Sequence, residues 1–216
     1  MADYETITFD VEGPAVWITL NRDDVRNAFN GQMLADLLDV FEAAPKVPGA
    51  RVVVLTGVGS AFCAGADLHW MRAVRDFTYE QNLEESNQVA AVMRRIYDCP
   101  LPTIARVNGP AIGGGAGLVA CCDLAVAAEG ARFSLSEVKL GLIPSCISPY
   151  VIRKIGEGAA REFFLTGERI DAAKARAIGL VNEIAKEEEL DVVVARWVNQ
   201  LVTSGPVAVA KCKELI

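Results

Sequence analysis

The stretch TIARVNGPAIGGGAGLVACC, residues 103–122, joins a β-branched run, an Asn-Gly-Pro turn and three consecutive glycines that open an apolar segment. This pattern predicts a strand, a tight loop and the start of a helix. Glycine permits a positive φ and a close approach to the backbone, and the first turn of a helix leaves NH groups without intrahelical partners. The segment Gly113–Gly115 could therefore bind an anion, or stabilise negative charge that develops on a substrate oxygen.

Two phosphate-binding motifs do not fit this glycine segment. Gly109 and Gly114 have the spacing of a P-loop, but Gly115 stands where the lysine is required. Leu118 stands where a dinucleotide-binding fingerprint needs its third glycine. Two interpretations remain, namely stabilisation of a developing oxyanion and glycines that only allow close helix packing.

Composition indicates one globular domain with a large core, because the 216 residues are 52% hydrophobic. The net charge of -7 and the lack of a long basic run argue against nucleic acid or an anionic membrane surface as a partner. Six cysteines without a CxxC pair, and a single histidine, suggest neither a metal site nor a disulfide framework. We find no signal peptide and no apolar run of about 18 residues, so we expect a cytoplasmic protein.

Apolar strands alternate with helical patterns along the chain, which predicts an α/β fold with a largely parallel sheet. A helix should begin after Asn30 as N-cap and end before Pro45. The other expected strands are 4–10, 15–20, 51–56, 103–107, 124–127, 132–135 and 180–184, the first two forming a hairpin. The other expected helices are 79–98, 148–155, 159–165, 171–178, 187–203 and 207–216.

A second glycine loop lies in AFCAGADLHW, residues 61–70, where Gly65 follows a buried strand and precedes a predicted helix. This is the same arrangement as in the first stretch. Parallel sheets place ligands at the carboxyl ends of their strands, so the two loops could lie side by side. Their backbone NH groups would then converge on one oxygen and form an oxyanion hole.

Four motifs together resemble the enoyl-CoA hydratase/isomerase (crotonase) superfamily. They are NRDDVRNAFN, AFCAGADL, VNGPAIGGGAGL with CCDLAVA, and FSLSEVKLGLIP, in the order and at the separations seen in that family. The resemblance covers residues 4–216 and implies a spiral of repeated strand-strand-helix turns followed by C-terminal helices. It also implies an acyl-CoA substrate, no cofactor besides the coenzyme A of that substrate, and assembly as a homotrimer or hexamer.

By this resemblance, the oxyanion donors are the backbone NH groups of Ala66 and Gly114, and Glu137 is the general acid and base. A carboxylate beside an apolar pocket has a raised pKa, which suits proton transfer in both directions. The residues that the resemblance places at the coenzyme A or substrate contacts are Arg26, Ala28, Ala64, Ala66, Asp67, Leu68 and Gly114.

One departure from the family pattern leaves the reaction open. Hydratases with two glutamates carry the second one at the position of Gly117, and Ser145 replaces an aspartate of the dienoyl-CoA isomerases and aromatic dehalogenases. A single Glu137 can shuttle a proton between two acyl carbons, as in an isomerase. It could also take a proton from water and return it to the α-carbon, which gives hydration. The likeness of FSLSEVKLGLIPSCISPYVIRKIGE to the bacterial methylglutaconyl-CoA hydratases of leucine breakdown favours hydration.

Three further expectations follow from the same sequence. One alternative is a family member that binds acyl-CoA without catalysis. A less favoured alternative is a nucleophilic pair of His69 and Cys146 that hydrolyses a thioester. We expect Trp70, Met71, Phe77 and Tyr79 either to shape the acyl site or to pack in the core. We expect a core domain over 1–186 and a C-terminal helical region from 187 to 216 that is truncated relative to the family, which would leave the pocket more open.

Overall fold

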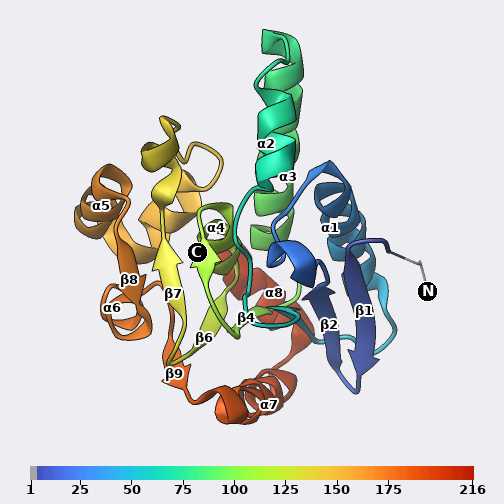
Figure 1. Ribbon diagram of the computed structural model, residues 1–216. Coiled ribbons are helices and arrows are strands. Elements are labelled where there is room, and N and C mark those ends of the chain that lie inside the picture. Colours follow the sequence, from blue (N-terminus) through green and yellow to red (C-terminus); the bar gives the residue numbers. More distant parts are fainter. Residues whose placement is uncertain (1–3) are drawn as a thin grey trace.

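A six-stranded sheet in the order β1-β2-β3-β4-β6-β9 forms the centre of the computed structural model, which describes residues 4–216 (Figure 1). β1 and β2 pair as an antiparallel hairpin, and every other pair in this sheet is parallel. Its strands are β1 Ile7–Glu12, β2 Ala15–Leu20, β3 Val52–Gly57, β4 Thr103–Val107, β6 Leu124–Ala128 and β9 Glu183–Ala185. All residues of β3 are buried, as expected for a central parallel strand.

A smaller sheet in the order β5-β7-β8 stands beside the larger one, with β5 Ala111–Ile112, β7 Arg132–Ser134 and β8 Arg169–Asp171. The helices are α1 Gly31–Ala43, α2 Leu68–Val74, α3 Tyr79–Tyr97, α4 Gly114–Cys121, α5 Ser148–Thr166, α6 Ala172–Ala177, α7 Leu190–Val202 and α8 Pro206–Leu215. Short 3-10 turns occur at Asp23–Val25, Ala44–Lys46, Ser136–Leu140 and Glu187–Glu189. In Figure 1, α2 and the start of α3 project beyond the rest of the molecule.

The predicted helix starts are confirmed where the sequence carries a capping residue. The Asn30 side chain accepts a hydrogen bond of 3.0 Å from the NH of Met33 at the start of α1. Helix α4 begins at Gly114, within the glycine segment. The predicted hairpin is also confirmed, although β1 runs from Ile7 to Glu12 and not over 4–10.

Several predicted boundaries were wrong. The helices expected at 148–155 and 159–165 are the two parts of α5, which is kinked at Gly156 because that residue adopts φ 76° and ψ 161°. The strand expected over 180–184 is β9, at Glu183–Ala185, because Leu180 and Asn182 make loop hydrogen bonds first. The two-residue β5 and the three-residue β8 were missed, since strands this short have no periodicity.

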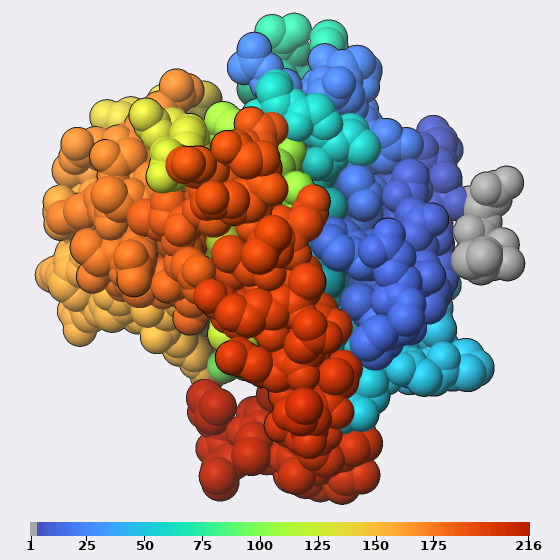
Figure 2. Space-filling model, turned by 90° about the horizontal axis from the view of Figure 1, so that it is seen from below, coloured from blue at the N-terminus to red at the C-terminus, as the bar shows by residue number. Residues whose placement is uncertain are grey.

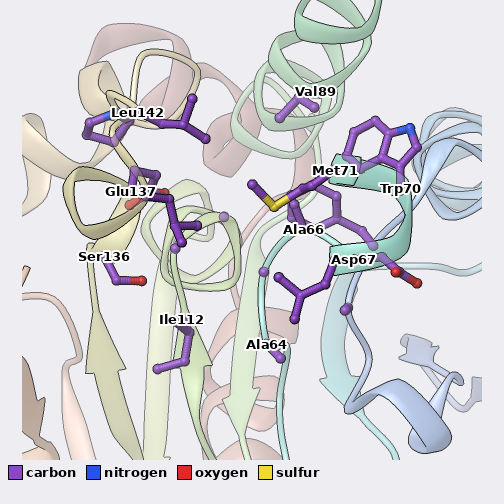
Figure 3. A pocket seen from close by; sticks show the side chains of 18 of the residues that line it. Ala64, Ala66, Asp67, Trp70, Met71, Val89, Ile112, Ser136, Glu137 and Leu142 are labelled. Carbon is purple, nitrogen blue, oxygen red and sulfur yellow. The ribbon is translucent and has the colours of Figure 1, made fainter. Parts of the chain in front are cut away.

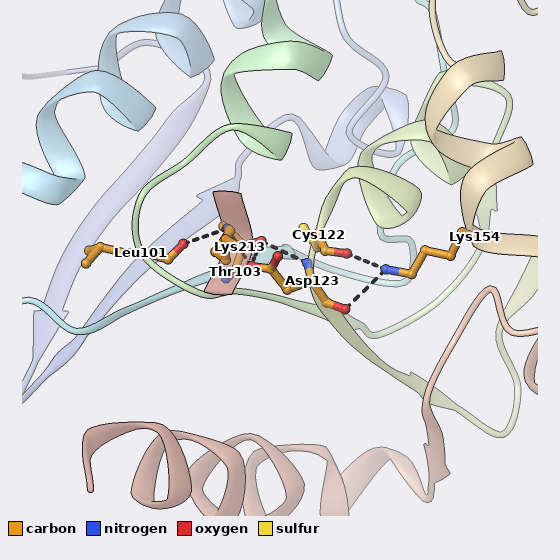
Figure 4. A network of polar contacts seen from close by, with 6 residues as sticks. All are labelled: Leu101, Thr103, Cys122, Asp123, Lys154 and Lys213. Atoms are coloured by element: carbon orange, nitrogen blue, oxygen red, sulfur yellow. Dashed lines mark hydrogen bonds and ion pairs between the residues drawn. The ribbon is translucent and has the colours of Figure 1, made fainter. Parts of the chain in front are cut away.

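The C-terminal helices pack across the chain. Helix α7 lies on β3, β4 and β6, and Figure 2 shows it crossing between the N-terminal half and the α5–α6 segment. Lys213 of α8 donates to Leu101 O at 3.0 Å and to Asp123 Oδ2 at 2.6 Å (Figure 4). Asp123 Oδ2 also accepts from the NH and the hydroxyl of Thr103, so α8 is tied to the starts of β4 and β6.

A second lysine extends this polar network. Lys154 of α5 donates to Cys122 O at the end of α4 and, at 3.4 Å, to Asp123 O. Burial of this ammonium lowers the pKa of Lys154. The contact holds α5 against α4, the helix that begins at the glycine segment.

Among the described helices, none is both long enough and apolar enough to cross a bilayer.

Candidate active site

A cavity of about 600 Å³ opens where the loops before α1 and α2 meet the start of α4 and the segment between β7 and α5 (Figure 3). Every site residue predicted from the sequence lines this cavity. Those residues are Arg26, Ala28, Ala64, Ala66, Asp67, Leu68, Gly114 and Glu137. Segments that are far apart in the chain therefore meet at one site.

Gly114 presents a backbone NH to the cavity because the turn before it is possible only for glycine. Gly113 adopts φ 53° and ψ -121°, and its own NH donates to Ser134 O at 2.7 Å. Gly114 is the first residue of α4, so its NH has no intrahelical acceptor. This NH is free to bind a ligand oxygen at the positive end of the helix.

Ala66 presents the second NH. In the loop before α2, the NH groups of Cys63, Ala64 and Asp67 donate to backbone carbonyls on both sides of the loop, at 2.9–3.1 Å. Within residues 4–216, the NH of Ala66 donates to no backbone carbonyl. The NH of Ala66, which lines the cavity, is therefore not used by the loop itself.

The loop before α2, which carries Ala66, is in contact with the loop before α4, which leads into Gly114. We call these two segments the donor loops. A Cβ atom placed on Gly65 would lie 3.8 Å from the Gly114 nitrogen and 2.8 Å from Ile112 O. Gly65 also has φ 91°, so only glycine fits this point. The loops that carry Ala66 and Gly114 therefore lie against each other at one cavity, which is the arrangement expected for an oxyanion hole.

Glu137 lies next to these donors in the 3-10 turn that follows β7. A Cβ atom on Gly113 would lie 3.1 Å from Glu137 Oε1, and Figure 3 shows Glu137 and Ala66 on opposite sides of one space. Glu137 Oε2 is buried, and within the described residues it has no hydrogen-bond partner. Burial raises the pKa of this carboxyl, because desolvation disfavours the charged form.

Gly117 is packed against an apolar side chain. A Cβ atom at this position would lie 2.2 Å from Ile147 Cγ2 and 3.5 Å from Met93 Cε. Both of these side chains are buried. The place from which a second carboxylate would project is therefore already filled.

The far side of the donor loops is built on two left-handed residues that are not glycine, Arg26 with φ 55° and Asn27 with φ 56°. The buried Asn27 side chain accepts from the NH of Arg22 and donates to Val58 O and Ala61 O, which holds this conformation. The carbonyl of Arg26 accepts from the NH of Ala64 at 3.0 Å. Sequence reasoning missed Asn27, although Asn is one of the residue types that tolerate this conformation.

Asp67 fixes the start of α2. Its carboxylate accepts from the NH of His69 at 2.8 Å and from the Arg22 guanidinium at 2.9 Å. Burial opposes its ionisation, but these hydrogen bonds outweigh the effect and lower the pKa of Asp67. The loop that carries Ala66 is thus held from both sides.

The remaining walls are mostly apolar. Trp70 and Met71 line the cavity as expected, whereas Phe77 and Tyr79 do not. Phe29, which packs edge-to-face on Trp70, was missed although it lies in a motif quoted from the sequence. Missed wall residues from other elements are Val89, Ile112, Ser136, Leu140, Leu142, Ile143, Pro144 and Ile147.

His69 and Cys146 both line the cavity but form no pair. Cys146 Sγ donates to Ser86 O at 3.4 Å, and no hydrogen bond joins it to His69 within residues 4–216. The same part of the chain holds no cluster of three or more His, Cys, Asp or Glu side chains arranged to bind a metal ion.

Comparison with known proteins connects this geometry to one family. The family model described as enoyl-CoA hydratase/isomerase matches residues 12–216. A candidate enoyl-CoA hydratase of Thermus thermophilus is 38% identical over 95% of this chain and 81% of its own length. A crotonyl-CoA hydratase of Syntrophomonas wolfei is 34% identical over 97% of this chain and 80% of its own length.

A solved structure agrees as well. An enoyl-CoA hydratase from Shewanella pealeana superposes with a TM-score of 0.95 at 39% identity, covering 98% of this chain and 79% of that chain. This superposition confirms the predicted α/β fold.

Proposed function

Because the chain belongs to the enoyl-CoA hydratase/isomerase (crotonase) family, we propose that it adds water to the double bond of an α,β-unsaturated acyl-CoA thioester. The observation that carries the proposal is the meeting of two unpaired backbone donors, at Ala66 and Gly114, with the buried carboxyl of Glu137. These groups suit a reaction that moves protons while negative charge collects on one oxygen.

The reaction needs one carboxylate. Glu137 takes a proton from water, the water oxygen bonds to the β-carbon, and the electrons of the double bond move to the thioester oxygen. The NH groups of Ala66 and Gly114 stabilise this enolate, and one such donor typically contributes about 2.7–4 kcal/mol to the transition state. Protonated Glu137 then gives its proton to the α-carbon, and the product is a 3-hydroxyacyl-CoA. No metal or redox cofactor is required in this scheme.

Isomerisation is the second candidate, and the packing of Ile147 on Gly117 favours it, since no second carboxylate can project into the site from position 117. Here Glu137 takes a proton from the α-carbon of a 3-enoyl-CoA. The dienolate is held by the same two donors, and the proton returns to the γ-carbon. Both reactions use the same residues and differ only in whether water enters.

From the sequence resemblance we propose 3-methylglutaconyl-CoA as one hydratase substrate, and the name of the Syntrophomonas relative suggests crotonyl-CoA as another. The same sequence resemblance is the basis for proposing that the protein assembles as a homotrimer or hexamer. Arg26, Ala28, Ala64 and Leu68 are the proposed contacts for coenzyme A, because they line the cavity beside the donor loops.

The deciding experiment follows the absorbance of the conjugated thioester. Its loss with crotonyl-CoA or 3-methylglutaconyl-CoA would show hydration, and its appearance with a 3-enoyl-CoA would show isomerisation. Turnover only in the second assay would replace the hydratase by the isomerase. Binding of acyl-CoA with no turnover in any assay would indicate a binding protein without catalysis.

The pH dependence of kcat/KM is a first prediction. Glu137 acts as a base only when it is ionised, and burial raises its pKa above the ordinary value of 4.5. Activity should therefore fall on the acid side at a pH above that of an exposed glutamate. An acid limb at or below about pH 4.5 would contradict this assignment.

Unfolding measurements provide the control. A carboxyl with a raised pKa binds its proton more tightly in the folded state, so its contribution to stability is present at low pH and is lost as pH rises through the folded pKa. Glu137→Gln cannot ionise. Its stability relative to the wild type should thus increase from low pH to neutral pH.

A further inference from the structure

An ion pair lies behind the loop that carries Ala66. The next residue, Asp67, is buried, and its Oδ2 accepts a hydrogen bond of 2.9 Å from the Arg22 guanidinium. Figure 3 shows Asp67 beside Ala66, and both line the cavity. Arg22 is not among the described residues that line the cavity. Any effect of Arg22 on a bound ligand therefore passes through the groups that it contacts.

The backbone of this loop has its own hydrogen bonds. Phe29 and Ala66 form a parallel bridge, in which the NH of Phe29 donates to Gly65 O at 2.8 Å and the NH of Asp67 donates to Phe29 O at 2.9 Å. None of these bonds involves the Arg22 side chain. A variant that lacks the guanidinium therefore keeps the bonds that place the Ala66 peptide.

Asp67 puts a negative charge close to the Ala66 donor. Burial opposes its ionisation, but its hydrogen bonds lower the pKa of Asp67, so the carboxylate is charged at neutral pH. By chain geometry alone, it lies no more than about 12 Å from an oxygen that accepts from the NH of Ala66. At an effective dielectric constant of about 20, one unit charge at this distance changes an ionisation equilibrium by about tenfold. An unpaired Asp67 would thus oppose negative charge on a ligand oxygen.

The guanidinium of Arg22 neutralises this charge. Within residues 4–216, Arg22 is the one ion-pair partner of Asp67, and the two side chains are 19% and 7% exposed. Asp24, Arg26 and His69 also line the cavity, but all three are exposed, so water and salt screen them. Arg22 therefore decides whether Asp67 adds a net charge to the site.

We propose that Arg22 is a positioning residue of the oxyanion hole, which acts by pairing with Asp67 so that negative charge can collect on the thioester oxygen. The inference rests on the proposed function, because an acyl-CoA thioester is what brings such an oxygen to the two donor NH groups. Loss of the guanidinium should weaken the stabilisation of an enolate, whereas the uncharged thioester should bind nearly as before. Arg22 contributes in this way without touching the substrate.

The test measures the ionisation of a bound 3-ketoacyl-CoA. Acetoacetyl-CoA loses a proton from its α-carbon and forms an enolate, whose charge is shared by the ketone and thioester oxygens and whose ultraviolet absorbance reports its formation. The measurement needs no turnover. Arg22→Gln should raise the pH at which the bound ligand is half ionised by about one unit, a tenfold loss of enolate stabilisation. Arg22→Lys keeps the positive charge and should give a smaller rise.

Changes at Asp67 separate the effect of charge from that of local structure. Asparagine can still accept from the NH of His69, so Arg22→Gln combined with Asp67→Asn should recover at least half of the rise. A rise that is equal or larger in this double variant would overturn the proposal. Asp67→Asn alone leaves Arg22 unpaired and should lower the half-ionisation pH. A higher value there would overturn the proposal even if Arg22→Gln did not fold.

Arg106→Gln is the matched control. Arg106 pairs with Asp191 at 2.6 Å and is 17% exposed, close to the value for Arg22, but it is not among the described residues that line the cavity. Its loss should leave the half-ionisation pH unchanged. An unchanged value in a folded Arg22→Gln protein would overturn the inference and leave the hydratase proposal in place. The expected rise, without turnover of any enoyl-CoA, would retain the inference and reject the hydratase.

Discussion

Glu137→Gln is expected to lower kcat for hydration by about 10²–10⁴-fold, the usual contribution of a general acid and base. Glutamine keeps the shape of the side chain but can neither accept a proton from water nor return one to the α-carbon. The two backbone donors remain in place, so affinity for a saturated acyl-CoA should stay near that of the wild type. Steady-state assays with crotonyl-CoA, together with calorimetric binding of butyryl-CoA, would separate the two quantities.

The matched control for this variant is Glu129→Gln, because Glu129 is an exposed glutamate in a turn and does not line the cavity. It should retain full activity. Thermal unfolding should show Glu137→Gln to be at least as stable as the wild type at neutral pH, because the change removes a buried carboxylate that has one unpartnered oxygen. Undiminished turnover by this variant would sink the assignment of Glu137.

Local signals in the sequence were sufficient for elements whose ends carry a specific residue. Asn30 marks the start of α1 because its side chain caps the helix, and the glycine segment marks the start of α4 because the turn needs a positive φ. The cavity residues were located through family motifs and not through periodicity. Those motifs placed Ala66, Gly114 and Glu137 at one site, and the structure brings the three together.

Features created by contacts between distant segments could not be predicted in this way. The strand expected at 180–184 shifts to β9 because Asn182 exchanges hydrogen bonds with the backbone of Ala125. Ile147 fills the space beside Gly117 although 29 residues separate them in the sequence. In each case the deciding information is tertiary packing, which a linear pattern does not contain.

The contact between Gly117 and Ile147 leads to the second large effect. Gly117→Ala should destabilise the protein by about 1–3 kcal/mol, because the new Cβ atom would lie 2.2 Å from Ile147 Cγ2 and the packed core must move. Gly117→Glu should be worse, since it also buries a carboxylate against Ile147 and Met93. Urea unfolding would measure both. Restoring the second carboxylate of the two-glutamate hydratases therefore requires more than one substitution.

A double-mutant cycle tests whether Ile147 is the cause. Ile147→Ala alone should cost about 2–5 kcal/mol through the cavity that it leaves. Combined with Gly117→Ala, it should cost about 1–2 kcal/mol less than the two changes added together, because the new methyl group occupies part of that cavity. Gly158→Ala is the control: Gly158 also lies in a helix, and its Cβ would meet nothing within 4 Å, so it should be neutral or stabilising. Additive losses in the cycle would mean that Ile147 does not exclude the second carboxylate, and the case for a single-carboxylate site would then rest on Gly117 alone.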